Sequence, residues 1–135
     1  MKAYIAVKYH KDRRNKDIVD SLEAIIERKG FETVSIVGND YRGTNEFANS
    51  YDLMKVTFGK IDECDLLIID LSEKGVGLGI EAGYAYAKDI PVITIAKQGS
   101  DISETMEGIS RKTIFYNRIE DLEYKLQDIL KVGRP

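Results

Sequence analysis

Glu81 is the side chain of this sequence that is best suited to covalent chemistry. It lies within residues 75–85, a run with alternating glycines that reads GVGLGIEAGYA. Glycines let a ligand approach the backbone closely, and an ionised carboxylate can act as a covalent nucleophile, for example at a sugar carbon. The run therefore predicts a ligand site in which Glu81 is the reactive group.

The elements around Glu81 predict its place in the fold. The apolar run at 66–69, bracketed by Asp65 and Asp70, is typical of a strand buried on both faces of a parallel sheet. The glycines then predict a loop, and Glu81 falls where the next helix should begin, at the sheet edge where open α/β folds bind ligands. There the helix dipole is expected to keep the carboxylate ionised. The alternative is an acid that only complements the helix end.

Strands and helices are predicted to alternate along the whole chain. Apolar patterning predicts five strands, at 4–8, 33–37, 65–71, 91–96 and 113–116. Helices are predicted at 12–29, at 46–63, from Glu81 onward and at 119–130, whereas residues 38–45 predict a surface loop. The alternation favours one α/β domain over residues 1–135, flavodoxin-like or Rossmann-like, with a five-stranded parallel sheet and helices on both faces.

Composition narrows the classes of function. The chain has 135 residues and a net charge of −3, with acidic and basic residues mixed, which argues against a nucleic-acid partner. One cysteine excludes an internal disulfide, and one histidine, His10, makes a multi-histidine metal site or a Ser-His-Asp triad hard to build. No apolar segment approaches the ~18 residues of a membrane span, and the first residues are too few for a signal peptide. We expect a cytoplasmic protein, off the membrane, without metal or organic cofactor.

The glycine run formally satisfies one known motif. Gly77-x-Gly79-x-x-Ala82 matches the dinucleotide-binding fingerprint, but that fingerprint belongs directly after the first strand, and this run follows the third. The run has no Gly-Lys-Ser or Gly-Lys-Thr, which excludes a phosphate-binding P-loop. Neither motif therefore accounts for the run.

A known family accounts for it better. Asp65-x(4)-Asp70, the run Gly-x-Gly-x-Gly-x-Glu-x-Gly-Tyr-Ala and Pro91-Val92-Ile93 together resemble the nucleoside 2-deoxyribosyltransferases and the related 2'-deoxynucleoside 5'-phosphate N-glycosidases. The first strand and the Asp-Arg-Arg-Asn-Lys segment at 12–16 are similar to the amino-terminal stretch of this family. The resemblance extends over nearly the whole chain, and the run around Glu81 is its most specific part.

The resemblance implies an enzyme that acts on an N-glycosidic bond. Glu81 would attack the anomeric carbon of a (deoxy)nucleoside or its 5'-monophosphate and expel the base. The sugar would remain as a covalent ester until water or a second base resolves it. Tyr4 would orient the carboxylate, Tyr9 would line the base pocket, and Gly77 and Gly79 would wrap the sugar and its 5' group.

The resemblance also implies a homodimer or higher homo-oligomer. In the family, the segment after the fourth strand completes the site across the interface between two copies. In this chain that segment is 103–106, which ends at Met106. Composition gives no independent sign of this assembly.

Three positions depart from the family pattern. Thr57 stands where the family places an aspartate that protonates or holds the leaving base, and a threonine can only form a hydrogen bond there. Gly75 replaces a serine or aspartate that contacts phosphate or sugar hydroxyls. Bulkier residues at 7–10 replace a small glycine-rich segment, so Lys8 and His10 are candidates for the phosphate contacts that Gly75 no longer makes.

The sequence thus predicts cleavage or transfer of the N-glycosidic bond through a glycosyl-glutamate intermediate. The alternative is a catalytically weak or inactive nucleotide-binding or regulatory module on the same fold, because of Thr57 and Gly75. An NAD-cleaving domain of the Toll/interleukin-receptor kind also pairs a βα fold with a glutamate on a helix, but it fits the glycine run less well. Hydrolysis or transfer, ribose or deoxyribose, the base and the 5' phosphate stay open.

Overall fold

A parallel sheet forms the centre of the molecule. The computed structural model describes residues 1–128, and its five strands have the order β2-β1-β3-β4-β5, with every pairing parallel. The strands are β1 (Lys2–Ala6), β2 (Glu32–Val34), β3 (Leu66–Asp70), β4 (Val92–Lys97) and β5 (Lys112–Tyr116). This is the flavodoxin-like order, in which ligands bind beyond the carboxyl ends of β1 and β3, where the direction of winding reverses.

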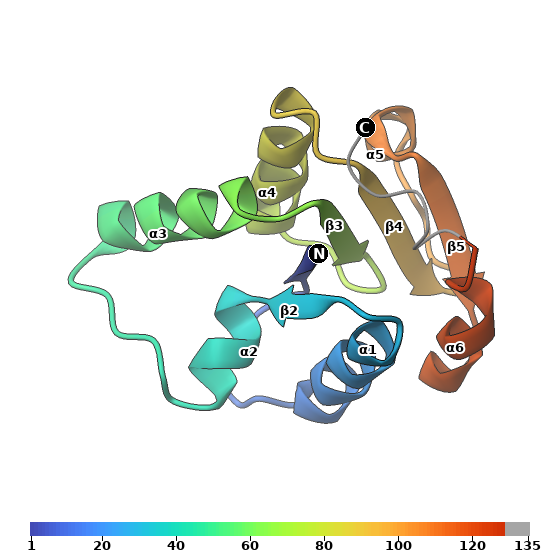
Figure 1. Cartoon of the computed structure of the whole chain (residues 1–135), viewed down its shortest axis with the longest axis horizontal. Coiled ribbons are helices and arrows are strands. Elements are labelled where there is room, and N and C mark those ends of the chain that lie inside the picture. The colour runs from blue at the N-terminus through green and yellow to red at the C-terminus, as the bar shows by residue number, and fades with distance from the viewer. Residues whose placement is uncertain (129–135) are drawn as a thin grey trace.

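Helices cover both faces of the sheet (Figure 1). One face carries α1 (Lys16–Arg28), the short 3-10 helix η1 (Ile119–Asp121) and α6 (Leu122–Lys125); the other carries α3 (Ser50–Asp62), α4 (Val76–Ala87) and α5 (Glu104–Ile109). The remaining helix, α2 (Ile36–Tyr41), lies beside the edge strand β2. Within residues 1–128, none of these helices is long and apolar enough to cross a membrane.

Each face of the sheet has its own apolar core, and strand alternation decides which side chains enter it. On β1, Ala3 and Ile5 belong to the cluster beneath α1, whereas Tyr4 and Ala6 belong to the cluster beneath α3 and α4. Burial of a large apolar side chain contributes about 1.5–3 kcal/mol. Tyr4 therefore points to the face of the sheet on which α4 packs.

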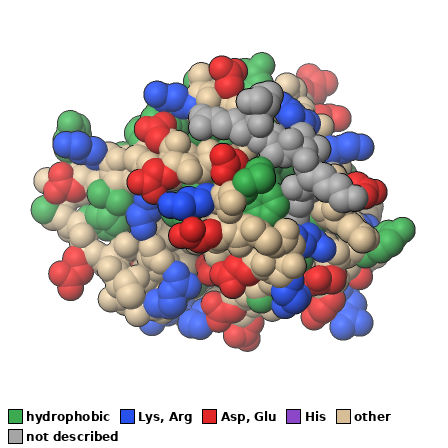
Figure 2. All heavy atoms as spheres, in the orientation of Figure 1, with side chains coloured by type: hydrophobic (Ala, Val, Ile, Leu, Met, Phe, Trp, Pro, Cys, Tyr) green, Lys and Arg blue, Asp and Glu red, His purple; other side chains and the backbone are tan. Residues whose placement is uncertain are grey.

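The predicted parallel α/β arrangement is confirmed, with shifted boundaries. The first helix begins at Lys16, where residue 12 was expected, and the last helix is the short α6, while residues 129 and 130 of the predicted helix lie outside the described residues. On the face shown in Figure 2, acidic and basic side chains are interspersed over the described part of the chain.

The predicted strand at 33–37 and the predicted loop at 38–45 are wrong in part. The strand β2 ends at Val34, and Ile36–Tyr41 is the helix α2. Ser35 is the reason, because its hydroxyl accepts a hydrogen bond from the backbone N–H of Gly38 at 2.6 Å and so caps the new helix. This capping residue outweighs the β-branched composition of the segment.

The predicted glycine loop before Glu81 is also wrong. The helix α4 begins at Val76, so Gly77 and Gly79 lie inside it and only Gly75 precedes it, as the N-cap residue. A glycine in a helix lowers stability by about 1 kcal/mol relative to alanine, but Leu78, Ala82 and Ala85 of the same helix are buried against the sheet. Tertiary packing therefore overrides the local preference of the glycines.

Candidate active site

A pocket of about 520 Å³ opens at the carboxyl ends of β1 and β3. Its walls come from the end of β1, from α2 and α3, and from the amino end of α4. The volume is in the range of pockets that bind small molecules. Most of the lining is apolar, and its polar and charged side chains are Lys8, Tyr9, Asp40, Thr57 and Glu81.

Glu81 and Tyr4 meet at this pocket. Tyr4 is 1% exposed on β1, and its hydroxyl donates a hydrogen bond of 2.8 Å to Oε1 of Glu81. Burial, and then the neighbouring charge of Glu81, raise the pKa of Tyr4. The phenol therefore stays a hydrogen-bond donor that fixes one oxygen of the carboxylate, and the other oxygen has no hydrogen-bond partner within the described chain.

The carboxylate of Glu81 is not kept ionised as the sequence predicted. Desolvation raises its pKa to about 7, and the hydrogen bond from Tyr4 opposes this only in part. Glu81 is the sixth residue of α4 and lies in the second turn, whereas the effect of the helix dipole falls off within the first turn. Near neutral pH the site therefore contains both the charged and the neutral form of this acid.

Lys8 extends over Gly75. A Cβ atom placed on Gly75 would lie 3.0 Å from Nζ of Lys8, so the missing side chain leaves the space that the lysine occupies. The backbone of Gly75 is extended, with φ of −167°, and does not itself require glycine. Within residues 1–128 the ammonium group of Lys8 has no hydrogen-bond or ion-pair partner, although it borders the same pocket as Glu81.

Thr57 and Tyr9 both line the pocket but differ in exposure. Thr57 is 2% exposed, and its hydroxyl donates to the carbonyl oxygen of Leu53 at 2.8 Å. Tyr9 is 46% exposed, and its ring lies 5.9 Å from the ring of Tyr41. A hydrogen bond to Asp40, followed by desolvation, raises the pKa of Tyr9.

His10 lies beside the pocket and does not line it. Its Nε2 atom is 2.6 Å from Oε2 of Glu73, and its backbone N–H donates to the hydroxyl of Tyr41 at 2.8 Å. These bonds join the loop after β1 to the loop after β3 and to the end of α2. The geometry supports a role for His10 in holding the loops together, not the direct phosphate contact that was considered from the sequence.

The three other predicted site residues divide between two pockets. Gly77 lines the pocket of Glu81. Gly79 and Met106 instead line a neighbouring pocket of about 430 Å³ towards α5, and Gly75 borders both pockets. Within one chain, the tertiary structure therefore does not bring Met106 to the wall around Glu81.

Sequence reasoning missed several residues of the pocket wall. Ile36, Val37 and Asp40 were assigned to a strand and a loop, but α2 carries them to the pocket. The capping pattern that begins at Ser35 was the signal that could have revealed this helix. Leu53 and Met54 fall within the helix predicted at 46–63, where their apolar side chains gave no sign of a function, yet they line the pocket.

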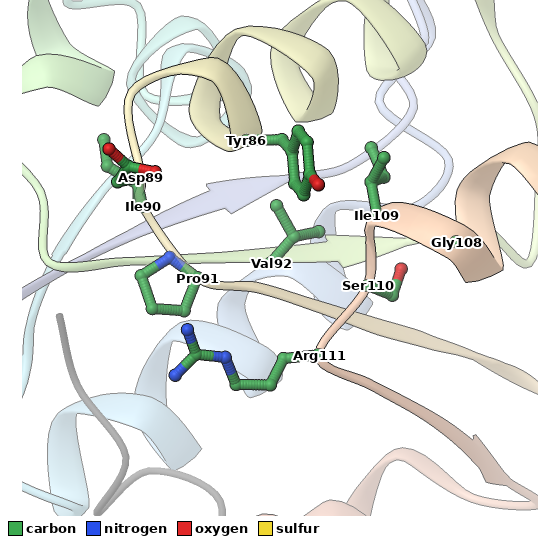
Figure 3. Close-up of a pocket in the computed structure, with 9 residues that line it drawn as sticks. All are labelled: Tyr86, Asp89, Ile90, Pro91, Val92, Gly108, Ile109, Ser110 and Arg111. Carbon is green, nitrogen blue, oxygen red and sulfur yellow. The ribbon is translucent and has the colours of Figure 1, made fainter. Parts of the chain in front are cut away.

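Another hollow, of about 230 Å³, lies near the amino ends of β4 and β5 (Figure 3). Tyr86, Val92 and Ile109 border it, and the side chain of Arg111 extends towards Pro91. Tyr86 lies in the last turn of α4, more than one turn beyond Glu81, and borders this hollow and not the pocket of Glu81. Among the described residues, no group of three or more His, Cys, Asp and Glu side chains could hold a metal ion.

Comparison with known proteins found similarity along nearly the whole chain. A family model described as nucleoside 2-deoxyribosyltransferase matches residues 3–124. A Thermofilum pendens protein, provisionally named 2'-deoxynucleoside 5'-phosphate N-hydrolase 1, is 23% identical over 136 aligned positions that cover 96% of this chain and 95% of that protein.

Two solved structures share the fold. A CMP N-glycosidase from Clostridium botulinum superimposes with a TM-score of 0.68 and 23% identity, and the match covers 96% of this chain and 99% of that one. A 2-deoxyribosyltransferase from Bacillus psychrosaccharolyticus also gives a TM-score of 0.68, with 16% identity over 92% of this chain and 91% of that one. At these identities the structural likeness shows the fold alone.

Proposed function

Because this chain belongs to the nucleoside 2-deoxyribosyltransferase family, whose enzymes cleave or transfer N-glycosidic bonds, we propose that Glu81 is the nucleophile of such a reaction. One observation carries this proposal: the hydroxyl of Tyr4 donates to Oε1 of Glu81 at 2.8 Å, at the wall of the 520 Å³ pocket. A buried donor that fixes one carboxylate oxygen leaves the other free to attack.

The reaction proceeds in two displacements at the anomeric carbon. A carboxylate oxygen of Glu81 forms a bond to this carbon while the glycosidic C–N bond breaks and its electron pair leaves with the base. A proton from water neutralises the departing base, since Thr57 supplies no acid and its hydroxyl is bonded to Leu53. Water or a second base then attacks the same carbon and releases the carboxylate.

The position of Lys8 supports the proposal that the substrate carries a 5' phosphate. Its unpaired ammonium group lies over Gly75 and lines the same pocket as Glu81. A charge-assisted hydrogen bond between an ammonium and a phosphate is about twice as strong as a neutral one. The relatives named for CMP and for 2'-deoxynucleoside 5'-phosphates are consistent with this substrate class.

The surface of α4 supports association with a second copy of this chain. Apart from Glu81, no residue of this helix is charged, and its apolar residues Val76, Ile80 and Tyr86 are 84%, 47% and 56% exposed. Helices that are apolar all round are normally covered. We therefore infer a homodimer in which this face is buried, next to the pocket of Gly79 and Met106.

The direct test is chromatographic detection of free base. Nucleosides, deoxynucleosides, their 5'-monophosphates and NAD are incubated with the unmodified protein, with Glu81→Ala and with Glu120→Ala, which removes an exposed carboxylate on η1. We expect base release that is lost by at least about 10³-fold in Glu81→Ala and retained in Glu120→Ala. Addition of a second base then distinguishes transfer from hydrolysis.

The alternative function makes a different prediction in the same experiment. If Thr57 and Gly75 make the protein an inactive nucleotide-binding module, calorimetry detects binding of a panel member while no variant releases base. Release of nicotinamide from NAD, with no reaction of the other compounds, would instead support an NAD-cleaving enzyme. Either result would overturn the proposed reaction.

A further inference from the structure

A second carboxylate lies in the pocket of Glu81. Among the described lining residues, Asp40 on α2 is the only acidic side chain besides Glu81. It belongs to a different wall from Glu81, because α2 and α4 follow different strands of the sheet. The proposed reaction assigns no role to this acid.

The position of Asp40 is well defined. Its helix is capped by Ser35, and the next residue, Tyr41, is 3% exposed and donates a hydrogen bond of 2.6 Å to Oδ1 of Asn15. The hydroxyl of Tyr9 interacts with Asp40 at the rim of the pocket. No Lys or Arg of the described chain forms an ion pair with Asp40, so the carboxylate can accept a further donor from a ligand.

The base is the part of a nucleotide that remains for Asp40 to contact, because other groups of the pocket are assigned to the sugar and the phosphate. The proposed reaction assigns the anomeric carbon to Glu81, and the 5' phosphate to Lys8. Most of the remaining wall is apolar, and apolar side chains can contact the faces of a base; its residues include Phe47, Leu53 and Met54. Asp40 borders this same pocket, so a base against the apolar wall can present an edge to the carboxylate.

A carboxylate distinguishes bases by their edges. When ionised it only accepts hydrogen bonds, and it pairs with the exocyclic amino group of cytosine. Adenine has such a group as well, whereas uracil and hypoxanthine have a carbonyl oxygen at the corresponding position. A carbonyl oxygen that faces a carboxylate oxygen in a partly buried pocket leaves both of these atoms without a donor, which strongly disfavours the carbonyl bases.

We propose that Asp40 selects substrates whose leaving base carries an exocyclic amino group, and that Tyr9 is the positioning residue that orients this carboxylate. The selection rests on the proposed function, because it assumes that a nucleotide occupies the pocket of Glu81. Asp40 thus decides which base is accepted, although its helix, α2, carries none of the groups proposed to react.

The test measures binding, so that it does not depend on turnover. Calorimetric titrations with CMP, UMP, AMP and IMP use the Glu81→Ala protein, alone and combined with Asp40→Asn, Tyr9→Phe or Asp20→Asn. A carboxamide both donates and accepts hydrogen bonds, so in the Asp40→Asn protein we expect the preference for the amino base over its carbonyl partner to fall by about 10- to 100-fold. Asp20→Asn removes an exposed carboxylate on α1 and should keep the preference.

Tyr9→Phe separates positioning from folding. We expect a smaller loss of preference with little change in the urea midpoint of unfolding, because Tyr9 is 46% exposed. Equal affinity for the members of both pairs in the Glu81→Ala protein, an unchanged preference in the Asp40→Asn protein, or no binding of any of the four nucleotides overturns the assignment of Asp40. Selective binding without base release by the unmodified protein overturns the proposed reaction and leaves this assignment standing.

Discussion

At the scale of single residues, Glu81 is held between two opposing requirements. Burial in the pocket removes water from the carboxylate and raises its pKa to about 7, but a nucleophile must be ionised. The hydrogen bond from Tyr4 favours the ionised form and partly offsets the desolvation. The reactivity of Glu81 therefore depends on pH within the neutral range.

The pH dependence of the rate gives a first prediction. We expect kcat to rise with pH around a midpoint of about 7, as Glu81 loses its proton. In Tyr4→Phe, loss of the hydrogen bond that lowers the pKa of Glu81 should move the midpoint upward and reduce kcat by about 10- to 100-fold. Initial rates measured across the pH range test this, and an unmoved midpoint in Tyr4→Phe would contradict the role of Tyr4.

Glu81→Gln should stabilise the protein at high pH. The ordinary pKa of Glu81 is 4.5 and its folded value is about 7, so between these values the folded protein keeps a proton that the unfolded chain has lost. The free energy of unfolding therefore falls as the pH rises through this interval.

Urea titrations measure this effect directly. Above about pH 8 we expect Glu81→Gln to unfold with a free energy larger by about 1–3 kcal/mol, and below about pH 5 the difference should nearly disappear. Glu120→Gln, at an exposed site, serves as the matched control. An equal stabilisation at both pH values would mean that the charge of Glu81 is not its source.

Lys8 and Gly75 should behave as a coupled pair. Gly75→Ser introduces an atom that meets the end of the lysine side chain, which is flexible and can move away. Stability should change by less than about 1 kcal/mol, while the KM for a nucleoside monophosphate rises because the ammonium is displaced. Lys8→Ala alone should raise the same KM and leave the KM for the nucleoside unchanged.

The double variant completes this cycle. If the added serine hydroxyl takes over the phosphate contact, Lys8→Ala with Gly75→Ser should bind the monophosphate better than the sum of the two single changes predicts. Additive effects would indicate that the two residues do not share one ligand group. Unchanged binding in Lys8→Ala would remove the phosphate assignment.

At the scale of elements, α2 depends on one close contact. A Cβ on Gly38 would collide with Oε1 of Glu23 and lie 2.8 Å from Oγ of Ser35, the capping residue. Glu23 is itself mostly buried, and its pKa is raised by desolvation, which an ion pair of 3.3 Å with Arg42 opposes. The packing of α2 on α1 therefore favours glycine at this position, because a larger residue would displace the side chain of Glu23 or Ser35.

Two alanine substitutions test this contact. Gly38→Ala should lower the free energy of unfolding by about 1–3 kcal/mol, because it forces the buried carboxylate of Glu23 to move. Gly59→Ala is the matched control in α3, where nothing lies within 4 Å of the added atom, and should raise stability by about 0.5–1 kcal/mol. Denaturant unfolding of both variants gives the comparison, and equal effects would argue against the contact.

The same element decides part of the site. Ser35 begins α2, and α2 supplies Asp40 and Val37 to the pocket wall. A short helix of this kind carries a weak periodic signal, so β-branched residues before it dominate a prediction from sequence. The cap is the more specific signal, since it depends on a particular side chain at a particular spacing.

At the scale of the whole molecule, the pocket collects residues that are distant in the sequence. Lys8 follows β1, Thr57 lies on α3, and Glu81 lies on α4, yet all three line one cavity. The order of the strands is the reason, because β1 and β3 are neighbours and their following segments leave the sheet in different directions.

The exposed apolar face of α4 predicts the state of assembly. We expect a homodimer in sedimentation velocity at micromolar concentration, and a monomer for Ile80→Glu, because a buried charge without a partner strongly disfavours the interface. Tyr124→Glu alters an apolar side chain that is more exposed than Ile80 and lies on α6, on the opposite face of the sheet, and this variant should remain dimeric. A monomeric unmodified protein would contradict the inferred dimer.

The sequence by itself determined the elements whose signals are local. The apolar runs of β3 and β4, the stripe of α1 and the alternation of strands and helices predicted the parallel sheet, because burial imposes a period on each element. The run around Glu81 indicated the family, because its residues are contiguous and can be read as one motif.

Only the tertiary structure decided the properties that arise between elements. The burial that raises the pKa of Glu81, the space over Gly75 that Lys8 occupies, and the arrival of Asp40 at the pocket each depend on segments far apart in the chain. Desolvation and steric contact act through space and leave no period or spacing in a single segment. For that reason Glu81, which the sequence predicted to be ionised, instead has a pKa of about 7, because its burial disfavours the charged form.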